Sequence, residues 1–248
     1  MKEQLNIGGT LVSYYKFGTG KKAIVFLHGW RSDGMVWKNV ADSIDQNLFS
    51  IYLVDLPGFG SSPKPSTVFT VSDYAKVVAG LIDKLGCEKV IIVGHSFGGR
   101  IAIKLSVEYS DLVSRLVLVD SAGIRSPKAD NYNRMAKIAK PFFKPKFMQG
   151  LRKLIYKRIG SEDYLETSEL RETYKNLISE DLSVFLSKID APTLVVWGED
   201  DESTPIEDAR VIHKKIKDSR LEIVKNAGHF SFLEKPAEFT KLLNEFIE

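Results

Sequence analysis

The sequence predicts an α/β protein with a doubly wound, mainly parallel sheet, and two observations support this fold class. First, the chain contains six short runs of apolar, mostly β-branched residues. They lie at residues 23–27, 51–54, 90–93, 116–119, 193–197 and 221–224. Five of the six are almost continuously apolar, as is typical of parallel strands that helices cover on both faces. Second, longer amphipathic stretches separate the runs, and such alternation favours a parallel sheet.

Both ends of the chain carry local signals of their own. Residues 5–17 place the turn Gly8-Gly9 between two extended segments, which predicts an N-terminal hairpin. Near the other end, Pro236 suits the first turn of a helix. The apolar residues that follow it share one face, so we expect a helix over residues 236–246.

The stretch over residues 72–85 is the clearest amphipathic helix between two strands. Its apolar side chains recur at spacings of three and four residues. Ser72 is expected to cap its start, and Gly86 follows its end, where glycine commonly terminates a helix.

One long interval, residues 125–188, breaks the alternation. It holds no strand-like run, only helical patterning, and 64 residues are too many for a simple crossover. We therefore expect a core formed by residues 1–124 and 189–248, with residues 125–188 as a helical cap. The charge of this interval is uneven. Residues 125–160 hold eleven Lys or Arg and one acid, whereas residues 161–190 hold three basic and eight acidic residues.

The composition excludes several classes of protein. The 248 residues are 44% hydrophobic and 27% charged, as in ordinary globular proteins. A single cysteine, Cys87, provides neither an intramolecular disulfide nor a thiolate metal site, which favours a reducing compartment. The net charge of +3 gives no reason to expect nucleic acid. No apolar run approaches the roughly 18 residues of a membrane span, and the N-terminus lacks a signal-peptide pattern, so we expect a cytoplasmic protein.

The most informative motif is G-x-S-x-G at residues 94–98, placed after a buried strand and before a helix. This context is the one that a nucleophile elbow requires. The chain must turn sharply so that Ser96 projects from the carboxyl edge of the sheet. Gly94 and Gly98 flank it because larger side chains would collide across so tight a turn. Ser96 is therefore the candidate nucleophile.

A serine nucleophile needs a base, and the chain has four histidines. His28 ends the first central strand, His95 adjoins the nucleophile with its side chain pointing away, and His213 falls on a surface helix. His229 follows the last strand, in a loop at the carboxyl edge of the sheet. Only His229 is placed to meet Ser96 across that edge.

The base in turn needs an acid that fixes its tautomer and stabilises the imidazolium. Three acidic residues follow the strand at 193–197, and spacing alone does not choose between Asp200 and Asp201. Asp120, at the end of the strand at 116–119, is a rival. The order Ser…Asp…His holds for every choice.

With these motifs in place, the chain resembles the α/β-hydrolase fold family, over nearly all of its length outside the cap. Besides the elbow, residues 55–62 match the family's D-x-P-G-x-G-x-S turn and residues 198–201 its G-x-x-D pattern. The resemblance implies an α/β-hydrolase fold with a helical cap insertion over the active site. It also implies Asp201 as the acid.

The same resemblance implies an oxyanion hole and a substrate site. The H-G-x segment at residues 28–30 implies that the backbone N–H of Trp30 is one oxyanion donor, and the N–H of Phe97 would be the second. Apolar cap residues are expected to form the acyl site together with the Trp30 side chain. These residues are Tyr132, Met135, Phe142, Phe143, Phe147 and Met148.

The motif set implies a serine hydrolase that needs no metal and no organic cofactor. A carboxylic ester with a small or medium acyl chain is the default substrate, and lactonases and carbon–carbon bond hydrolases share the same motifs. Serine at position 96 argues against dehalogenase or epoxide-hydrolase chemistry, which uses aspartate there. A non-enzymatic alternative is a receptor-type member that binds a ligand in this pocket.

Part of the chain resembles the pimeloyl-acyl-carrier-protein methyl ester esterases, although His95 stands where those enzymes often carry Trp. The basic half of the cap could attract an acidic acyl-carrier protein. We favour the simpler explanation, that its Lys and Arg residues coat exposed helix faces. The expected partner is thus a small-molecule ester or lactone.

Overall fold

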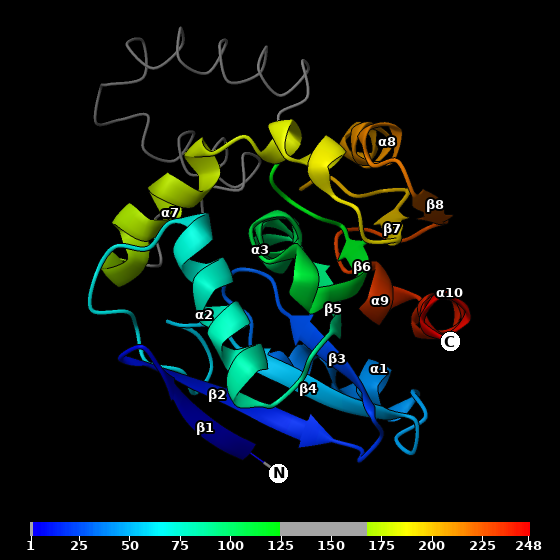
Figure 1. Ribbon diagram of the computed structural model, residues 1–248. Helices are drawn as coiled ribbons and strands as arrows, with labels where there is room; N and C mark the ends of the chain where they lie inside the picture. Colours follow the sequence, from blue (N-terminus) through cyan, green and yellow to red (C-terminus); the bar gives the residue numbers. More distant parts are fainter. Residues whose placement is uncertain (1, 125–167) are drawn as a thin grey trace, which may run out of the picture.

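The computed structural model describes residues 2–124 and 168–248, and a sheet of eight strands forms the centre of the described part (Figure 1). The strands lie in the order β1-β2-β4-β3-β5-β6-β7-β8. Their bounds are Lys2–Ile7 (β1), Thr10–Phe17 (β2), Lys22–Leu27 (β3), Phe49–Asp55 (β4), Val90–His95 (β5), Val113–Val119 (β6), Thr193–Gly198 (β7) and Ser219–Val224 (β8). β2 runs antiparallel to β1 and β4, and all the other neighbouring strands of this sheet are parallel. The predicted α/β-hydrolase fold class is confirmed.

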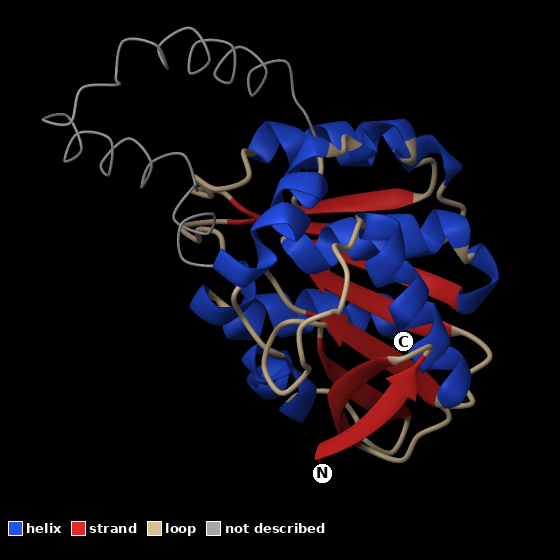
Figure 2. Cartoon of the chain, turned by 90° about the vertical axis from the view of Figure 1, so that its left-hand side faces the viewer, coloured by secondary structure: helices blue, strands red, loops and turns tan. Residues whose placement is uncertain are grey.

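Helices cover both faces of the sheet (Figures 1 and 2). One layer contains α2 (Val71–Lys84), α3 (Phe97–Glu108) and α8 (Ile206–Lys215). The other contains α1 (Lys38–Asp42), α9 (Ser231–Glu234) and α10 (Pro236–Ile247). Short 3₁₀ helices η1 (Gly34–Trp37), η2 (Ser110–Leu112), η5 (Ser168–Leu170), η6 (Leu182–Val184) and η7 (Leu186–Lys188) complete the described elements, together with α7 (Arg171–Ser179).

This layering explains why the strands are apolar along their whole length. In β3, Ile24 and Phe26 pack into the layer of α10, whereas Val25 and Leu27 pack into the layer of α2 and α3. All four side chains are fully buried. A strand with helices on both faces has no solvent-facing side, so the period-two alternation of a half-exposed strand disappears.

The N-terminal hairpin and the ends of α2 test the local predictions. β1 and β2 form the hairpin with the turn at Gly8-Gly9, as the sequence indicates. The predicted cap of α2 is wrong. Thr70, rather than Ser72, caps the helix, because its hydroxyl accepts the N–H of Asp73 while the Asp73 carboxylate accepts the N–H of Thr70. Gly86, with φ +70°, ends the helix as expected.

The return from the predicted cap to the core is described from residue 168 onward. Here α7 is followed by η6 and η7 before β7 begins. η6 contacts α3, the helix that starts behind Ser96. The N-terminal part of the expected cap, residues 125–167, lies outside the described residues.

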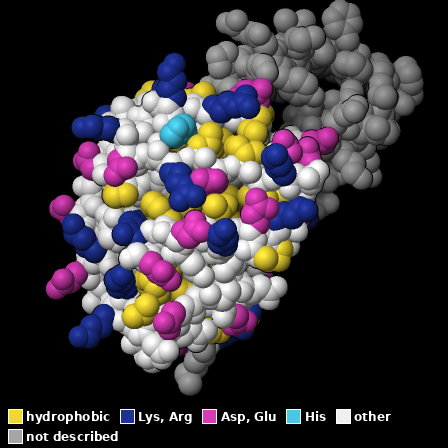
Figure 3. Space-filling view, turned by 90° about the vertical axis from the view of Figure 1, so that its right-hand side faces the viewer, with side chains coloured by type: hydrophobic (Ala, Val, Ile, Leu, Met, Phe, Trp, Pro, Cys, Tyr) yellow, Lys and Arg dark blue, Asp and Glu magenta, His cyan; other side chains and the backbone are white. Residues whose placement is uncertain are grey.

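The face of the molecule that carries α8, β8 and α10 shows acidic and basic side chains interspersed (Figure 3). Arg220, on β8, forms ion pairs with Glu222 and with Glu245 of α10. Over residues 2–124 and 168–248, no helix is both long and apolar enough to cross a membrane.

Candidate active site

Ser96 occupies a strained turn at the carboxyl end of β5. Its backbone lies at φ +50° and ψ −109°, a region that non-glycine residues rarely adopt, and α3 begins at the next residue. A Cβ added at Gly94 would lie 2.5 Å from the carbonyl oxygen of Gly98, and one added at Gly98 would lie 2.3 Å from that of Leu27. The two glycines therefore let the turn pass against β3, and the serine stands at the edge of the sheet.

Hydrogen bonds join Ser96, His229 and Asp201 into one chain. The Ser96 hydroxyl lies 3.0 Å from His229 Nε2, and His229 Nδ1 lies 2.9 Å from Asp201 Oδ2. The three residues follow β5, β8 and β7, whose carboxyl ends meet at the same edge. The His229 side chain keeps 18% of its surface exposed, while that of Asp201 is fully buried. A hydroxyl, an imidazole and a carboxylate in this order can make the hydroxyl nucleophilic.

Asp201 is held as a carboxylate by several donors. Its Oδ1 accepts the backbone N–H groups of Ser203 and Thr204, and its Oδ2 accepts the Thr204 hydroxyl as well as His229. Burial alone would raise the pKa of Asp201, but the hydrogen bond and charge of His229 and the bonds from Thr204 outweigh it, so that this pKa is lowered. Asp200 is exposed, so the structure brings Asp201 and not Asp200 to His229.

Asp120, the rival acid, has a different task in the structure. Its Oδ1 accepts the N–H of Gly198, and its Oδ2 accepts both the N–H and the hydroxyl of Ser231. Both imidazole nitrogens of His229 bond to other groups. Burial, reinforced by the charge of Asp201, raises the pKa of Asp120 to about 7 against the hydrogen bonds from Ser231 and Gly198. Asp120 thus joins the ends of β6 and β7 to the segment after His229.

The other three histidines lie where the sequence places them. His28 is buried at the end of β3, where its Nε2 accepts the N–H of Leu56 and burial lowers its pKa. His213 is exposed on α8 and bonds to Ser219. His95 is buried on the opposite side of the turn from the Ser96 hydroxyl and bonds to the carbonyl oxygen of His229.

Trp30 and Phe97, the expected oxyanion donors, both line the pocket at Ser96. Phe97 is the first residue of α3, where backbone N–H groups have no partner within the helix. Within the described part of the chain, neither backbone N–H donates to another backbone carbonyl. The Trp30 ring packs edge-on against Phe97 and Phe59, at centroid distances of 5.2 and 4.7 Å, which fixes its place beside the serine.

A pocket of about 100 Å³ opens at Ser96 between the core and α7. Most of its walls are apolar, and one cation, Arg100, lies among the described lining residues. They are Trp30, Phe97, Arg100, Ala122, Tyr174, Leu177 and Ile178. The Tyr174 ring lies 5.0 Å from that of Trp30, so α7 and the loop after β3 meet over the serine.

The predicted acyl-site residues are only in part within the described structure. Trp30 lines the pocket as expected. Tyr132, Met135, Phe142, Phe143, Phe147 and Met148 lie outside the described residues. Sequence reasoning missed Tyr174, Leu177 and Ile178, although their spacing of three and four residues in a helical segment could have marked them as one face.

Glu234 is a second feature whose role sequence reasoning did not identify. Its carboxylate accepts the N–H of Gly228 at 2.9 Å, directly before His229. Nothing in the spacing between His229 and Glu234 indicates that this carboxylate holds the histidine loop. Within the described residues, no group of three His, Cys, Asp or Glu side chains could hold a metal ion.

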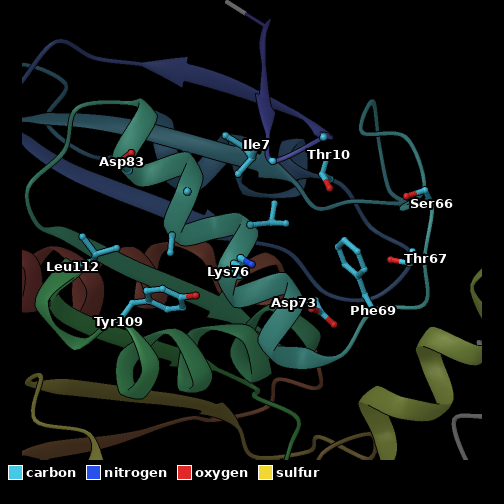
Figure 4. A pocket seen from close by; sticks show the side chains of 15 residues that line it. Ile7, Thr10, Ser66, Thr67, Phe69, Asp73, Lys76, Asp83, Tyr109 and Leu112 are labelled. Carbon is cyan, nitrogen blue, oxygen red and sulfur yellow. The ribbon is translucent and has the colours of Figure 1, made fainter.

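A larger groove, of about 700 Å³, lies away from these residues (Figure 4). It runs along α2 beside the turn of the β1–β2 hairpin, with Phe69 and Ile7 in its wall and Asp73 and Lys76 among its polar groups. It shares no lining residue with the pocket at Ser96.

Comparisons with known proteins agree with this geometry. Over 260 residues, the chain is 27% identical to a 2-hydroxy-6-oxononadienedioate/2-hydroxy-6-oxononatrienedioate hydrolase of Burkholderia vietnamiensis, covering 95% of this chain and 90% of that protein. The solved esterase EaEST of Exiguobacterium antarcticum matches with a TM-score of 0.79 at 24% identity, over 99% of both chains. A meta-cleavage product hydrolase of Pseudomonas fluorescens IP01 matches with a TM-score of 0.74 at 22% identity, over 98% of this chain and 96% of that one.

At these identities the two structures show a shared fold, and a family model extends the match to the sequence. That model, of the alpha/beta hydrolase family, matches residues 24–242, which include the elbow, the acid loop and the histidine loop. The chain belongs to the alpha/beta hydrolase family.

Proposed function

We propose that this chain is a serine hydrolase that cleaves carboxylic esters with small or medium acyl groups. The observation that carries the proposal is the unbroken hydrogen-bonded chain from Ser96 through His229 to Asp201, beside a mainly apolar pocket. Structural likeness to an esterase supports the same reaction class.

The proposed reaction begins with attack of Ser96 Oγ on the ester carbonyl, while His229 Nε2 takes the hydroxyl proton. The backbone N–H groups of Trp30 and Phe97 hold the oxyanion of the tetrahedral intermediate. Asp201 stabilises the imidazolium that forms. His229 then gives its proton to the leaving alkoxide, which departs as the alcohol and leaves an acyl-enzyme. Water, deprotonated by His229, attacks that ester in the same manner and releases the carboxylic acid.

The test of this proposal is a panel of esters, thioesters and lactones of graded chain length, combined with a fluorophosphonate probe. Ser96→Ala and His229→Ala should each lower kcat by at least about 10³-fold, because the oxyanion donors and binding supply only the residual rate. The probe should label wild-type protein at Ser96. His213→Ala, a histidine exposed on α8, is the matched control and should keep wild-type rates.

Several outcomes would contradict the proposal or change its substrate. Labelling of another residue, or wild-type rates in either active-site variant, would remove Ser96 and His229 from their roles. A wild-type protein that binds the panel compounds and labels at Ser96 but shows no turnover would favour the receptor-type alternative. Turnover of lactones in preference to open esters would reassign the substrate while keeping the mechanism.

A second candidate is hydrolysis of a carbon–carbon bond in a carboxylate-bearing substrate. The specific observation is that Arg100, a cation whose Nη1 donates to the carbonyl oxygens of Leu177 and Glu180, lines the pocket four residues after the nucleophile. The relative from Burkholderia vietnamiensis is named for dioates, which carry two carboxylates. Adding a 2-hydroxy-6-oxo-dienoate to the panel tests this candidate. Arg100→Met should then lower the rate on that substrate far more than the rate on a neutral ester.

A further inference from the structure

We infer that His95 is a positioning residue, which holds the base His229 in place by a hydrogen bond to its main-chain carbonyl oxygen. The inference rests on the proposed function, since it assigns a partner to the base of that reaction. His95 Nε2 lies 2.7 Å from the carbonyl oxygen of His229, a residue 134 positions away in the sequence. The side chain of His95, next to the nucleophile in sequence, thus binds the loop that carries the base His229.

The acceptor fixes the tautomer of His95. A carbonyl oxygen accepts only, so Nε2 must carry the hydrogen and Nδ1 must be unprotonated in the neutral ring. Nδ1 faces Gly29, where an added Cβ would lie 2.8 Å from it, and it makes no hydrogen bond within the described residues. His95 therefore has one hydrogen-bond donor, and this donor binds the carbonyl oxygen of His229.

Packing fixes the direction of this donor. His95 is 1% exposed, and aromatic rings pack around it. Its ring centroid lies 4.8 Å from that of His229, 5.0 Å from Phe230 and 5.1 Å from Phe232. The ring cannot rotate without displacing these neighbours, so the bond to the carbonyl holds the loop at a constant depth above the serine.

The other hydrogen bonds of the loop lie on both sides of His229. Before it, Glu234 accepts the N–H of Gly228, and Asp200 donates its N–H to the carbonyl of Ala227. After it, Glu234 accepts the N–H of Phe230 and Asp120 accepts that of Ser231. Among the hydrogen bonds between described residues, the one from His95 reaches the main chain of His229 itself. Proton transfer depends on sub-ångström placement of the base, because an error of about 1 Å can cost about 100-fold in rate.

His95 is not itself a second base. Burial, with the charge of His229 next, lowers the pKa of His95 to about 3. It stays neutral while His229 becomes an imidazolium, so no second cation opposes that charge. The role of His95 is therefore that of a fixed donor and not of a proton relay.

A pair of amide substitutions separates the donor from the ring. In His95→Gln the amide N–H can occupy the place of Nε2, whereas in His95→Asn the amide reaches only to the place of Nδ1, beside Gly29. We expect His95→Gln to keep kcat within about 3-fold of wild type. We expect His95→Asn and His95→Leu to lower kcat by roughly 10- to 100-fold with little change in KM. The rate of fluorophosphonate labelling of Ser96 should fall in the same proportion.

Two features of the design exclude a merely structural effect. Each variant is assayed at temperatures where circular dichroism shows it folded, so loss of kcat is not loss of protein. The rescue of kcat in His95→Gln, together with a loss in His95→Asn that falls on kcat and not on KM, assigns the effect to the lost donor.

The inference would be overturned by wild-type kcat in folded His95→Asn, by an equal loss in His95→Gln and His95→Asn, or by a rise in KM alone. Wild-type protein that neither labels at Ser96 nor turns over any ester would instead overturn the proposed function. Labelling of wild type with equal labelling of His95→Asn would overturn the inference and leave the proposed function standing.

Discussion

Two buried aspartates near His229 show how the groups around a carboxyl determine its pKa. Asp201 and Asp120 each accept three or more hydrogen bonds, and each sits after a neighbouring strand of the sheet. The pKa of Asp201 is lowered, chiefly by His229 and Thr204 against the effect of burial. Burial raises that of Asp120 to about 7. The carboxylate that faces a base thus has a lowered pKa, whereas the pKa of the one that accepts only from neutral donors is raised.

This contrast leads to a prediction for catalysis. Asp201→Asn should lower kcat by orders of magnitude, because an amide in that place favours the wrong imidazole tautomer. Asp120→Asn and Asp200→Asn should cost far less, since neither carboxylate bonds to the His229 ring in the structure. Steady-state kinetics of the three variants measures this. If Asp120→Asn lost most of its kcat while Asp201→Asn kept it, the acid of the triad would be Asp120, at the end of β6.

A second prediction concerns the pH dependence of stability. The folded state raises the pKa of Asp120 from 3.8 to about 7, so between these values it binds a proton more tightly than the unfolded chain does. The contribution of Asp120 is therefore fully present below about pH 4 and is lost as the pH rises through about 7. The difference in Tm between wild type and Asp120→Asn should decrease over this range. A difference that is constant from pH 4 to 8 would contradict the shift.

At the residue scale, the elbow was predictable from G-x-S-x-G because the tight turn itself requires the two glycines, whatever packs around it. The sequence did not choose between Asp200 and Asp201, since adjacent loop residues differ only in where the backbone points them. The family pattern, rather than spacing, favoured Asp201. The hydrogen bond from His95 to His229 could not be predicted from the sequence, because it joins two residues that are 134 positions apart.

At the scale of elements, α3 does more than present the nucleophile. Arg100 donates to the carbonyl oxygens of Leu177 and Glu180, at 2.7 and 3.1 Å. One turn further on, Lys104 forms ion pairs of 3.0 Å with Glu108 and with the side chain of Glu180, and its side chain is 6% exposed. These bonds join α3 to Leu177 of α7 and to Glu180 directly after it, and α7 carries the residues that line the pocket over Ser96.

The contribution of these contacts to stability can be tested at the ion pairs of Lys104. Glu180→Gln removes the acid that ties Lys104 to the segment after α7, and it should lower the free energy of unfolding by about 1–2 kcal/mol. Glu108→Gln is the matched control, because Glu108 lies on α3 itself and its ion pair with Lys104 joins no second element. The bond that Glu108 accepts from the Ser72 hydroxyl of α2 can be kept by the amide oxygen of Gln. The cost of Glu108→Gln should be about 0.5 kcal/mol. Chemical denaturation of both variants measures the two values, and equal losses would show that the segment is held by other contacts.

Element boundaries were predictable where the signal lies within one turn. The start of α2 was misplaced because Ser72 and Thr70 are both good caps, and only the reciprocal bond with Asp73 selects Thr70. Strands β3 to β8 were found from apolar runs alone. The short 3₁₀ helices between α7 and β7 carry no such periodicity, and they follow instead from how the chain returns to the core.

At the scale of the whole molecule, charge is nearly balanced overall, at +3, but uneven along the sequence. The basic stretch at residues 125–160 lies outside the described residues. For a small neutral ester we expect kcat/KM to change little between about 20 and 150 mM salt, because no charge on the substrate is screened. Steady-state rates at several ionic strengths measure this. A steep fall for the neutral ester would contradict the prediction.

A substrate carried by an acidic acyl-carrier protein provides the comparison. Its kcat/KM should fall steeply over the same salt range only if the basic stretch recruits the carrier. Charge reversal at Lys137, Lys140 and Lys144 decides this case. Unchanged rates on the carrier-bound substrate would show that the basic stretch does not attract the carrier.

The overall topology was predictable because every level of the sequence agrees with it. Alternating strands and helices, glycine turns and family patterns at four strand ends all lead to one sheet. The contents of the pocket were not predictable to the same degree. They depend on how α7 packs against α3, which no local pattern encodes.

The placement of the triad on β5, β7 and β8 also governs how activity returns to an unfolded chain. Ser96 and His229 are 133 residues apart, and contacts across so long a loop form late because closing the loop costs entropy. When the protein is diluted out of denaturant, buried Trp37 and Trp197 can report collapse of the two layers through their fluorescence. Hydrolysis must wait until β7 and β8 have docked beside β6. The lag between the two signals measures the time that the sheet needs to complete its last two strands.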